Sequence, residues 1–203
     1  MAATHSQGDK TPRTERGRKT LRKLLDAAAT EFAEKGFHEA SISGITRSAG
    51  VALGTFYTYF DSKDAVFRAL VSDMSAGVGK AAREALDPSM GALEIERVAL
   101  RAFLEFAAEH KEIYRIIDEA EFVDPDSYRA HYETIGSRIE ERLKLGGESG
   151  EFAPGLGAPE AWAVMGMNVF LGLRYVIWGR EGDPDFEEIA RRANMLLTRG
   201  IAS

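Results

Sequence analysis

The sequence predicts an all-α protein with a small N-terminal helix-turn-helix domain and a larger C-terminal helical domain. Apolar residues recur at helical spacing along most of the chain. Glycines and acid–proline pairs mark places where helices would end or begin, and no segment alternates apolar and polar residues as a half-buried strand does. Near residue 50, two short helical stretches are separated only by a turn that contains glycine, which is typical of a helix-turn-helix.

The first two helices are predicted from apolar spacing and from their end signals. In residues 18–37 the apolar positions share one helical face, and Gly36 follows as a C-terminal stop. Ser41 can cap a short second helix with its hydroxyl. That helix should end at Gly50, because glycine accepts the positive φ of a tight turn.

A third short helix is expected over Leu53–Phe60, directly after the glycine turn. Asp61 and Asp64 then have the spacing of a capping box. The segment AVFRALVSDM, residues 65–74, should then start a longer fourth helix.

Acid–proline pairs recur in the C-terminal part of the chain. Each pair combines an N-cap acid with a proline suited to the first helical position, so a helix should start at each one. The pairs are Asp87-Pro88, Asp124-Pro125 and Asp183-Pro184.

Ala158-Pro159 should open another helix that extends to about residue 179. This helix is nearly uncharged and is interrupted by Arg174, so it must be covered on most sides. The Gly/Pro-rich residues 146–159 that precede it should form a loop.

Composition limits the class of protein. The chain has 203 residues, of which 44% are hydrophobic, enough to bury a core. The absence of cysteine excludes disulfides, thiolate nucleophiles and cysteine zinc sites. No apolar run approaches the roughly 20 residues of a membrane span, and the N-terminus lacks the apolar stretch of a secretory signal. We therefore expect a soluble cytoplasmic protein without a membrane partner.

Charge is distributed unevenly along the chain. The net charge is −6, but residues 1–70 carry 11 basic and 8 acidic side chains, whereas the remainder carries 15 and 24. Residues 40–60 contain one arginine, Arg47, and no acid at all. A surface that lies against phosphates needs this lack of carboxylates.

The segment GVALGTFYTYFDSK, residues 50–63, has the chemistry of a nucleic-acid-reading helix. Gly54 near the helix start permits close approach to another molecule, and the threonine and tyrosine hydroxyls can reach phosphates and base edges. Phe56 and Phe60 should pack inward, and Lys63 could share a phosphate with a helix N-terminus. A small aromatic core corner with exposed hydroxyls is the alternative interpretation of the same residues.

Residues 24–70 resemble the DNA-binding domain of the TetR/AcrR family of transcriptional regulators. The resemblance is carried by a helix, "GF", a short helix, "AGV", "GTFYTYF" and "SK" in that order. It implies a homodimer that binds a double-stranded DNA operator and releases it when a small-molecule inducer binds. It also implies three regions: a disordered basic arm over residues 1–17, a three-helix helix-turn-helix DNA-binding domain over 18–64, and a helical ligand-binding and dimerisation domain over 65–203.

The resemblance also assigns candidate DNA contacts, residue by residue. The recognition helix falls on Leu53–Tyr59, the supporting helix carries two further contacts, and Lys63 takes the family's phosphate position. The chain departs from the family pattern at Ala52 and Leu53, where a serine cap and a polar residue are common. The candidate DNA-binding residues are Ser43, Arg47, Leu53, Gly54, Thr55, Tyr57, Thr58, Tyr59 and Lys63.

The C-terminal domain offers candidates for a ligand pocket. Aromatic and apolar residues at helical spacing could surround a cavity with a few polar groups, although such stripes are more often plain core. The candidates are Phe103, Phe106, Tyr114, Ile117, Tyr128, Met165, Asn168 and Arg174.

Arg174 needs an anion if it lies inside an apolar helix. Glu119 or Glu121 could supply it as a structural pair, or a ligand could supply a carboxylate or phosphate. Asn168 on the same helix carries a similar ambiguity. The sequence leaves these alternatives open.

Other chemistries are not indicated. The acidic run at residues 118–126 lacks the spacing of a calcium loop, and the histidines lack the Glu-x-x-His signature of di-iron bundles. The chain has no P-loop, GxSxG or GxGxxG motif. We expect no catalytic residues, metal or cofactor. A helical-bundle carrier or enzyme with a vestigial DNA-binding domain, and a nucleoid-type protein that binds any DNA, are the alternatives.

The last two helical stretches predict the dimer interface. Residues 161–178 are apolar on nearly every face, and Gly166 and Gly172 allow close helix approach. Residues 184–201 are amphipathic. Paired with their copies across a two-fold axis, these helices would form a four-helix bundle.

Overall fold

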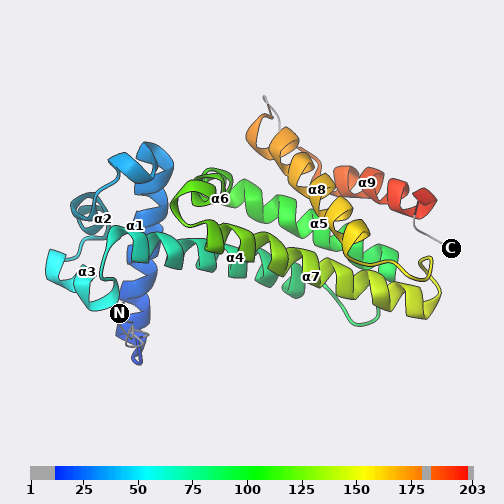
Figure 1. Cartoon of the computed structure of the whole chain (residues 1–203), viewed down its shortest axis with the longest axis horizontal. Helices are drawn as coiled ribbons and strands as arrows, with labels where there is room; N and C mark the ends of the chain where they lie inside the picture. The colour runs from blue at the N-terminus through cyan, green and yellow to red at the C-terminus, as the bar shows by residue number, and fades with distance from the viewer. Residues whose placement is uncertain (1–11, 180–183, 201–203) are drawn as a thin grey trace, which may run out of the picture. The chain divides into compact units, whose positions relative to one another are not determined.

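The computed structural model describes residues 12–179 and 184–200, and it confirms the all-α prediction (Figure 1). These residues fold into nine α-helices and one π-helical turn. The elements are α1 (Glu15–Glu39), α2 (Ile42–Ala49), α3 (Leu53–Tyr59), α4 (Lys63–Ala85), α5 (Ala92–Glu109), α6 (Glu112–Val123), α7 (Pro125–Ser149), α8 (Ala158–Gly172), η1 (Leu173–Ile177) and α9 (Phe186–Gly200).

The chain forms two compact units, and α4 contributes to both. The first unit contains the described residues up to Ser72 together with Arg115–Ser127. The second contains Asp73–Tyr114 and the described residues from Tyr128 onward. The division thus falls eight residues beyond the boundary predicted at residue 64, and it adds most of α6 to the first unit. Of the predicted N-terminal arm, residues 1–11 lie outside the described residues, and Glu15 already belongs to α1.

The core of the first unit is built from aromatic and branched side chains of α1, α3 and α4. Phe32 and Phe67 are fully buried, and their rings meet edge to face with centroids 5.1 Å apart. Phe56 of α3 is also fully buried, and Phe60 follows it at 7% exposure. Their inward orientation, predicted from the four-residue spacing, anchors α3 to the unit.

Helix α1 is interrupted at Gly36, which has φ +77°. Glu119 of α6 accepts a hydrogen bond from the Phe37 N–H at 2.9 Å, and Arg115 donates to the Ala33 carbonyl. A Cβ at Gly36 would lie 2.7 Å from the Glu119 carboxylate. The positive φ favours glycine at this position, and the absence of a side chain also leaves room for the Glu119 carboxylate.

The second unit is held together by apolar clusters that bring α9 back onto the earlier helices. One cluster, centred on Leu143 and Phe152, includes residues of α7, α8 and α9. A second cluster includes Leu104, Val176 and Ala190, from α5, η1 and α9. The interior of this unit is therefore shared by helices that are distant in sequence.

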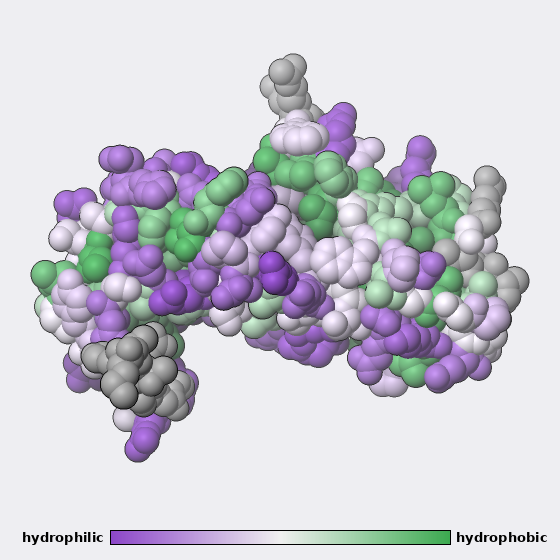
Figure 2. All heavy atoms as spheres, viewed as in Figure 1, coloured by the Kyte–Doolittle hydropathy of each residue, from purple (hydrophilic) through white to green (hydrophobic). Residues whose placement is uncertain are grey.

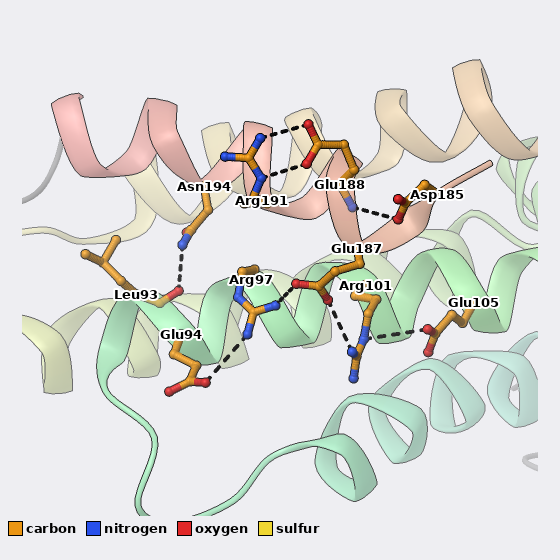
Figure 3. Close-up of polar contacts among 10 residues, drawn as sticks. All are labelled: Leu93, Glu94, Arg97, Arg101, Glu105, Asp185, Glu187, Glu188, Arg191 and Asn194. Atoms are coloured by element: carbon orange, nitrogen blue, oxygen red, sulfur yellow. Dashed lines mark hydrogen bonds and ion pairs between the residues drawn. The ribbon is translucent and has the colours of Figure 1, made fainter.

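Polar contacts add to the packing of α9 against α5, as Figure 3 shows. The Glu187 carboxylate contacts both Arg97 and Arg101 of α5. Asn194 donates its amide to the Leu93 carbonyl at 3.0 Å. These contacts fix the register of α9 along α5.

Some helix starts differ from the sequence prediction. Asp87-Pro88 forms a turn in which Asp87 accepts from Ser89, and α5 begins only at Ala92. Ser62, which the sequence analysis did not single out, caps α4 by accepting from the Ala65 N–H.

The other predicted starts have mixed outcomes. Helices α7 and α8 begin at Pro125 and Ala158 as predicted, but α7 extends to Ser149, into the stretch expected to be a loop. Asp183 lies outside the described residues, and Asp185 caps α9 through the Glu188 N–H.

His131 of α7 predicts a pH dependence of stability. Its Nδ1 lies 2.6 Å from the Ser75 Oγ, and burial lowers the pKa of the imidazole from 6.5 to about 4. The unfolded chain therefore takes up this proton at a higher pH than the folded chain does. Acidification from about pH 7 to about pH 5 should cost about 2 kcal/mol of unfolding free energy through this residue alone.

We expect His131→Gln to reduce that loss, because glutamine does not titrate and can still bond with Ser75. Urea unfolding of both proteins at the two pH values measures the difference. An equal loss in wild type and variant would rule out His131 as the source.

Candidate nucleic-acid interface and ligand cavity

Helices α2 and α3 form a tight helix-turn-helix, and local capping explains the geometry. The Ser41 hydroxyl accepts from the Gly44 N–H at 3.0 Å, which caps α2 as predicted. Gly50 has φ +66°, and the Val51 N–H bonds back to the Thr46 carbonyl. Helix α3 then starts at Leu53, and Ala52 before it provides no side-chain cap.

A buried carboxylate of α1 fixes the start of α2. Glu31 is 6% exposed, and its Oε1 accepts from Lys35 at 2.8 Å and from the Ser41 N–H at 3.2 Å. Burial opposes the charge, but these bonds and the charges of Lys35 and Arg47 outweigh it and lower the pKa of Glu31. Any Cβ at Gly44 would overlap this carboxylate, so α2 lies directly against it.

The outer face of α3 carries most of the predicted DNA contacts. Leu53 is 49% exposed and Tyr57 is 47% exposed, while Thr55 is half-buried. The exposed Thr58 hydroxyl donates to the Gly54 carbonyl at 3.3 Å. No atom outside α3 lies within 4 Å of a Cβ built on Gly54, so this glycine leaves open surface.

The remaining predicted contacts lie beside this face. On α2, Ser43 and Arg47 are exposed. Tyr59 is half-buried, and its hydroxyl donates to the Gly17 carbonyl at 3.3 Å. Some of the predicted DNA-contact residues are thus exposed, whereas the Tyr59 hydroxyl already has a hydrogen bond within the protein.

Lys63 has a structural role that sequence analysis did not predict. Its ammonium donates to the carbonyls of Phe37, His38 and Ala40 at 2.6, 3.0 and 3.0 Å. It also lies 4.6 Å from the centroid of the Phe37 ring. The first residue of α4 therefore closes the C-terminal end of α1, and its contact with a phosphate stays a prediction.

The second unit contains a cavity of about 70 Å³ between α4, α5, α7 and α8. Three predicted ligand residues, Phe103, Met165 and Asn168, line it. Most of its remaining wall is aliphatic, with Ile135 and Val169 among the lining residues.

The other predicted ligand residues are not among the residues that line this cavity. Phe106 packs on Gly77 and on the ring of His110, and the Tyr114 hydroxyl donates to the Val169 carbonyl at 3.0 Å. Ile117 is buried and belongs to the first unit. The Tyr128 ring meets the Tyr132 ring.

Arg174 is exposed, and its guanidinium lies 5.3 Å from the centroid of the Tyr175 ring. Within the described parts of the chain, its side chain has no ion pair with either proposed carboxylate. Glu119 instead bonds to the Phe37 N–H. Arg174 is thus a surface cation in the single chain, on the π-helical turn that follows α8.

Two cavity residues were missed by sequence analysis, namely Arg138 and Arg142 of α7. Arg142 forms a two-point ion pair with Glu96, at 2.5 and 3.0 Å. The Arg138 guanidinium packs on Gly79 of α4. Residues 135, 138, 139 and 142 recur at helical spacing on one face, and this signal could have identified both arginines.

The described residues contain no group of histidine and carboxylate side chains that could hold a metal ion. In this part of the chain, every helix is also too short or too polar to cross a lipid bilayer.

Comparison with known proteins supports the interpretation of α1–α4. The family model for "Bacterial regulatory proteins, tetR family" matches residues 24–70. The uncharacterized HTH-type transcriptional regulator YdgC of Bacillus subtilis is 32% identical over 50% of this chain and 54% of its own, so the chain spans about half of that relative. The similarly described YhgD of Bacillus subtilis is 25% identical over 89% of this chain and 95% of its own.

Among solved structures, the transcriptional regulator FadR from Bacillus subtilis in complex with stearoyl-CoA has the same fold. Its TM-score is 0.75 at 22% identity, covering 89% of this chain and 98% of that one. The fold, the helix-turn-helix geometry and the family match agree, and residues 24–70 form a DNA-binding domain of the tetR family of bacterial regulatory proteins.

Proposed function

We propose that this cytoplasmic protein is a repressor that binds a palindromic operator as a homodimer and leaves it when a small apolar or acidic molecule binds. The observation that carries the proposal is the exposed face of α2 and α3, which presents Arg47 and Tyr57. Occupation of an operator is sufficient to block transcription, so repression needs no surface beyond the DNA-reading face and the dimer interface.

The electrostatics of the reading face favour phosphate binding. Residues 40–60 contain no carboxylate, and the acid beneath α2, Glu31, is buried and paired with Lys35. A phosphate backbone would therefore approach Arg47 without repulsion from this segment. The glycine at position 54 leaves room for the approach.

The dimer surface is supported by exposed apolar residues of the second unit. Figure 2 shows apolar side chains gathered over the end of α8 and over α9. Exposed patches of this kind on one chain mark an interface, and a pair of such helices from each copy would give a self-complementary bundle. The exposed large side chains of this region are Trp162, Phe170, Tyr175, Trp178, Met195 and Leu196.

Helix α4 supports a route from ligand to operator, because one continuous helix contains both Gly79, at the cavity, and Lys63, which holds the end of α1. A ligand that shifts α4 would change both positions. FadR, which has this fold, was solved with stearoyl-CoA, and this supports a ligand with an apolar body.

Selection of duplexes from a random library, followed by binding measurements, tests the function. We expect a palindromic site that is bound much more tightly than random duplex. Equal affinity for all duplexes would favour a nucleoid-type protein, and no DNA binding would favour a carrier or enzyme with a vestigial domain.

Arg47 and Lys63 should differ in their effects on DNA binding and on stability. Arg47→Ala removes one exposed cation and should lower the slope of log affinity against log salt by about one. Lys63→Ala leaves the carbonyls at the end of α1 without their charged donor and should cost about 1–3 kcal/mol of unfolding free energy. Fluorescence anisotropy across a salt series and urea unfolding measure the two effects. An unchanged salt slope in the Arg47 variant would contradict a phosphate contact.

Leu196→Glu should break the dimer. Burial of an unpaired carboxylate costs several kcal/mol, so we expect dimer affinity to fall at least about a hundredfold. Leu145→Glu on α7 is the matched control, because Leu145 is 58% exposed and Leu196 is 65% exposed. Sedimentation equilibrium should show a monomer for the first variant and a dimer for the second, and a dimeric Leu196→Glu protein would place the interface elsewhere.

A further inference from the structure

The ligand cavity has an apolar wall and an unbalanced charge. Its polar side chains are Arg138, Arg142 and Asn168. Arg142 is neutralised by Glu96, whose side chain is only 1% exposed. This pair is complete within the protein, which leaves Arg138 as the cavity's uncompensated cation among the described residues.

Arg138 has a buried donor without an acceptor. Its Nη1 is shielded from solvent and has no hydrogen-bond partner within the described part of the chain. Burial of a guanidinium N–H without an acceptor costs desolvation free energy. An unsatisfied donor of this kind in a native structure therefore indicates a functional role, such as binding a ligand.

The backbone of α4 admits this guanidinium. A Cβ at Gly79 would lie 1.8 Å from Nη1 and 2.7 Å from Cζ of Arg138. With glycine at position 79, this side chain can lie directly against the backbone of α4. The charged group is brought against an apolar cavity although none of the described residues that line it is a carboxylate.

Asn168 of α8 supplies a second polar group with an open position. Its Oδ1 is buried and also has no hydrogen-bond partner in the described residues. An asparagine amide can turn by half a rotation and present its NH₂ group in place of the oxygen. Arg138 and Asn168 both line the cavity, and each can donate to an anion there.

We propose that the cavity binds an organic acid, with its anionic head at Arg138 and Asn168 and its apolar body against Ile135, Met165 and Val169. This inference rests on the proposed ligand-responsive function and names the ligand class. The cation stands within the apolar wall, so its partner is an anion attached directly to an apolar body. A coenzyme A thioester carries its charges on distant phosphates and lacks one at the acyl end.

The cavity volume sets the size of the acid. About 70 Å³ corresponds to roughly five water-sized spheres. This volume favours short straight-chain carboxylates, so the probes are butanoate and hexanoate, with octanoate and decanoate as longer acids for comparison. Hexanol and hexanoyl-CoA are the matched neutral and thioester probes.

Isothermal titration of the purified full chain tests the head-group assignment. Hexanoate should bind wild type more tightly than hexanol does, and Arg138→Met should weaken hexanoate binding about 10- to 100-fold, as expected for the loss of a charge-assisted hydrogen bond. Arg138→Lys should recover part of the affinity. Arg129→Met changes an exposed arginine of the same helix and should leave binding unchanged, and thermal melting checks that each variant is folded.

Three results would overturn the inference: no acid binding by wild type, equal hexanoate affinity in wild type and Arg138→Met, or hexanoyl-CoA binding that exceeds acid binding and does not depend on Arg138. Operator release is measured separately by anisotropy. Acid binding that depends on Arg138 without operator release would uphold the organic-acid site and contradict the proposed ligand response. Operator binding without any acid binding would contradict only the organic-acid site.

Discussion

The first unit depends on how α1 ends. Gly36 breaks the helix at φ +77°, and the carbonyls exposed by the break are bound by the ammonium of Lys63. Glu119 takes the Phe37 N–H. Helices α4 and α6 therefore satisfy the backbone groups that the end of a helix leaves unpaired. These bonds, made by charged groups within the unit, join the end of α1 to α4 and α6.

The DNA-reading face follows from that junction. The chain leaves α1 in an extended conformation at Ala40, and Glu31 then receives the Ser41 N–H. Gly44 lets α2 lie directly on this carboxylate, and Phe56 ties α3 to the core. Glu31 and Phe56, which make these contacts, are both buried on the inner side of the two helices. The outer side stays available for a phosphate backbone, and it is the side without carboxylates.

Local signals were sufficient to predict this part of the fold. Ser41 caps its own helix and Gly50 turns its own backbone, so both can be interpreted from a few neighbouring residues. Lys63 was assigned only to a phosphate, because its carbonyl partners lie 23 to 26 residues away in sequence. Arg174 was expected to be interior because its helix is nearly uncharged. A helix that is apolar all round can instead belong to an interface between copies, and the exposed Trp178 and Phe170 on the same stretch fit that explanation.

The polarity of the cavity could not be predicted in the same way, because it depends on which arginine of one helix is paired with a carboxylate of another helix. Arg138 and Arg142 look equivalent on α7, and only the fold shows that Glu96 neutralises one of them. The difference matters because a paired arginine is already neutralised within the fold, whereas an unpaired arginine needs an anion from outside the chain. Glycine at position 79 lets that guanidinium lie against the backbone of α4. An anion that draws the guanidinium toward itself would change the packing of α4 at this position. Arg138 would thus bind the head group and, by moving, alter the packing of α4. The first residue of α4, Lys63, holds the end of α1.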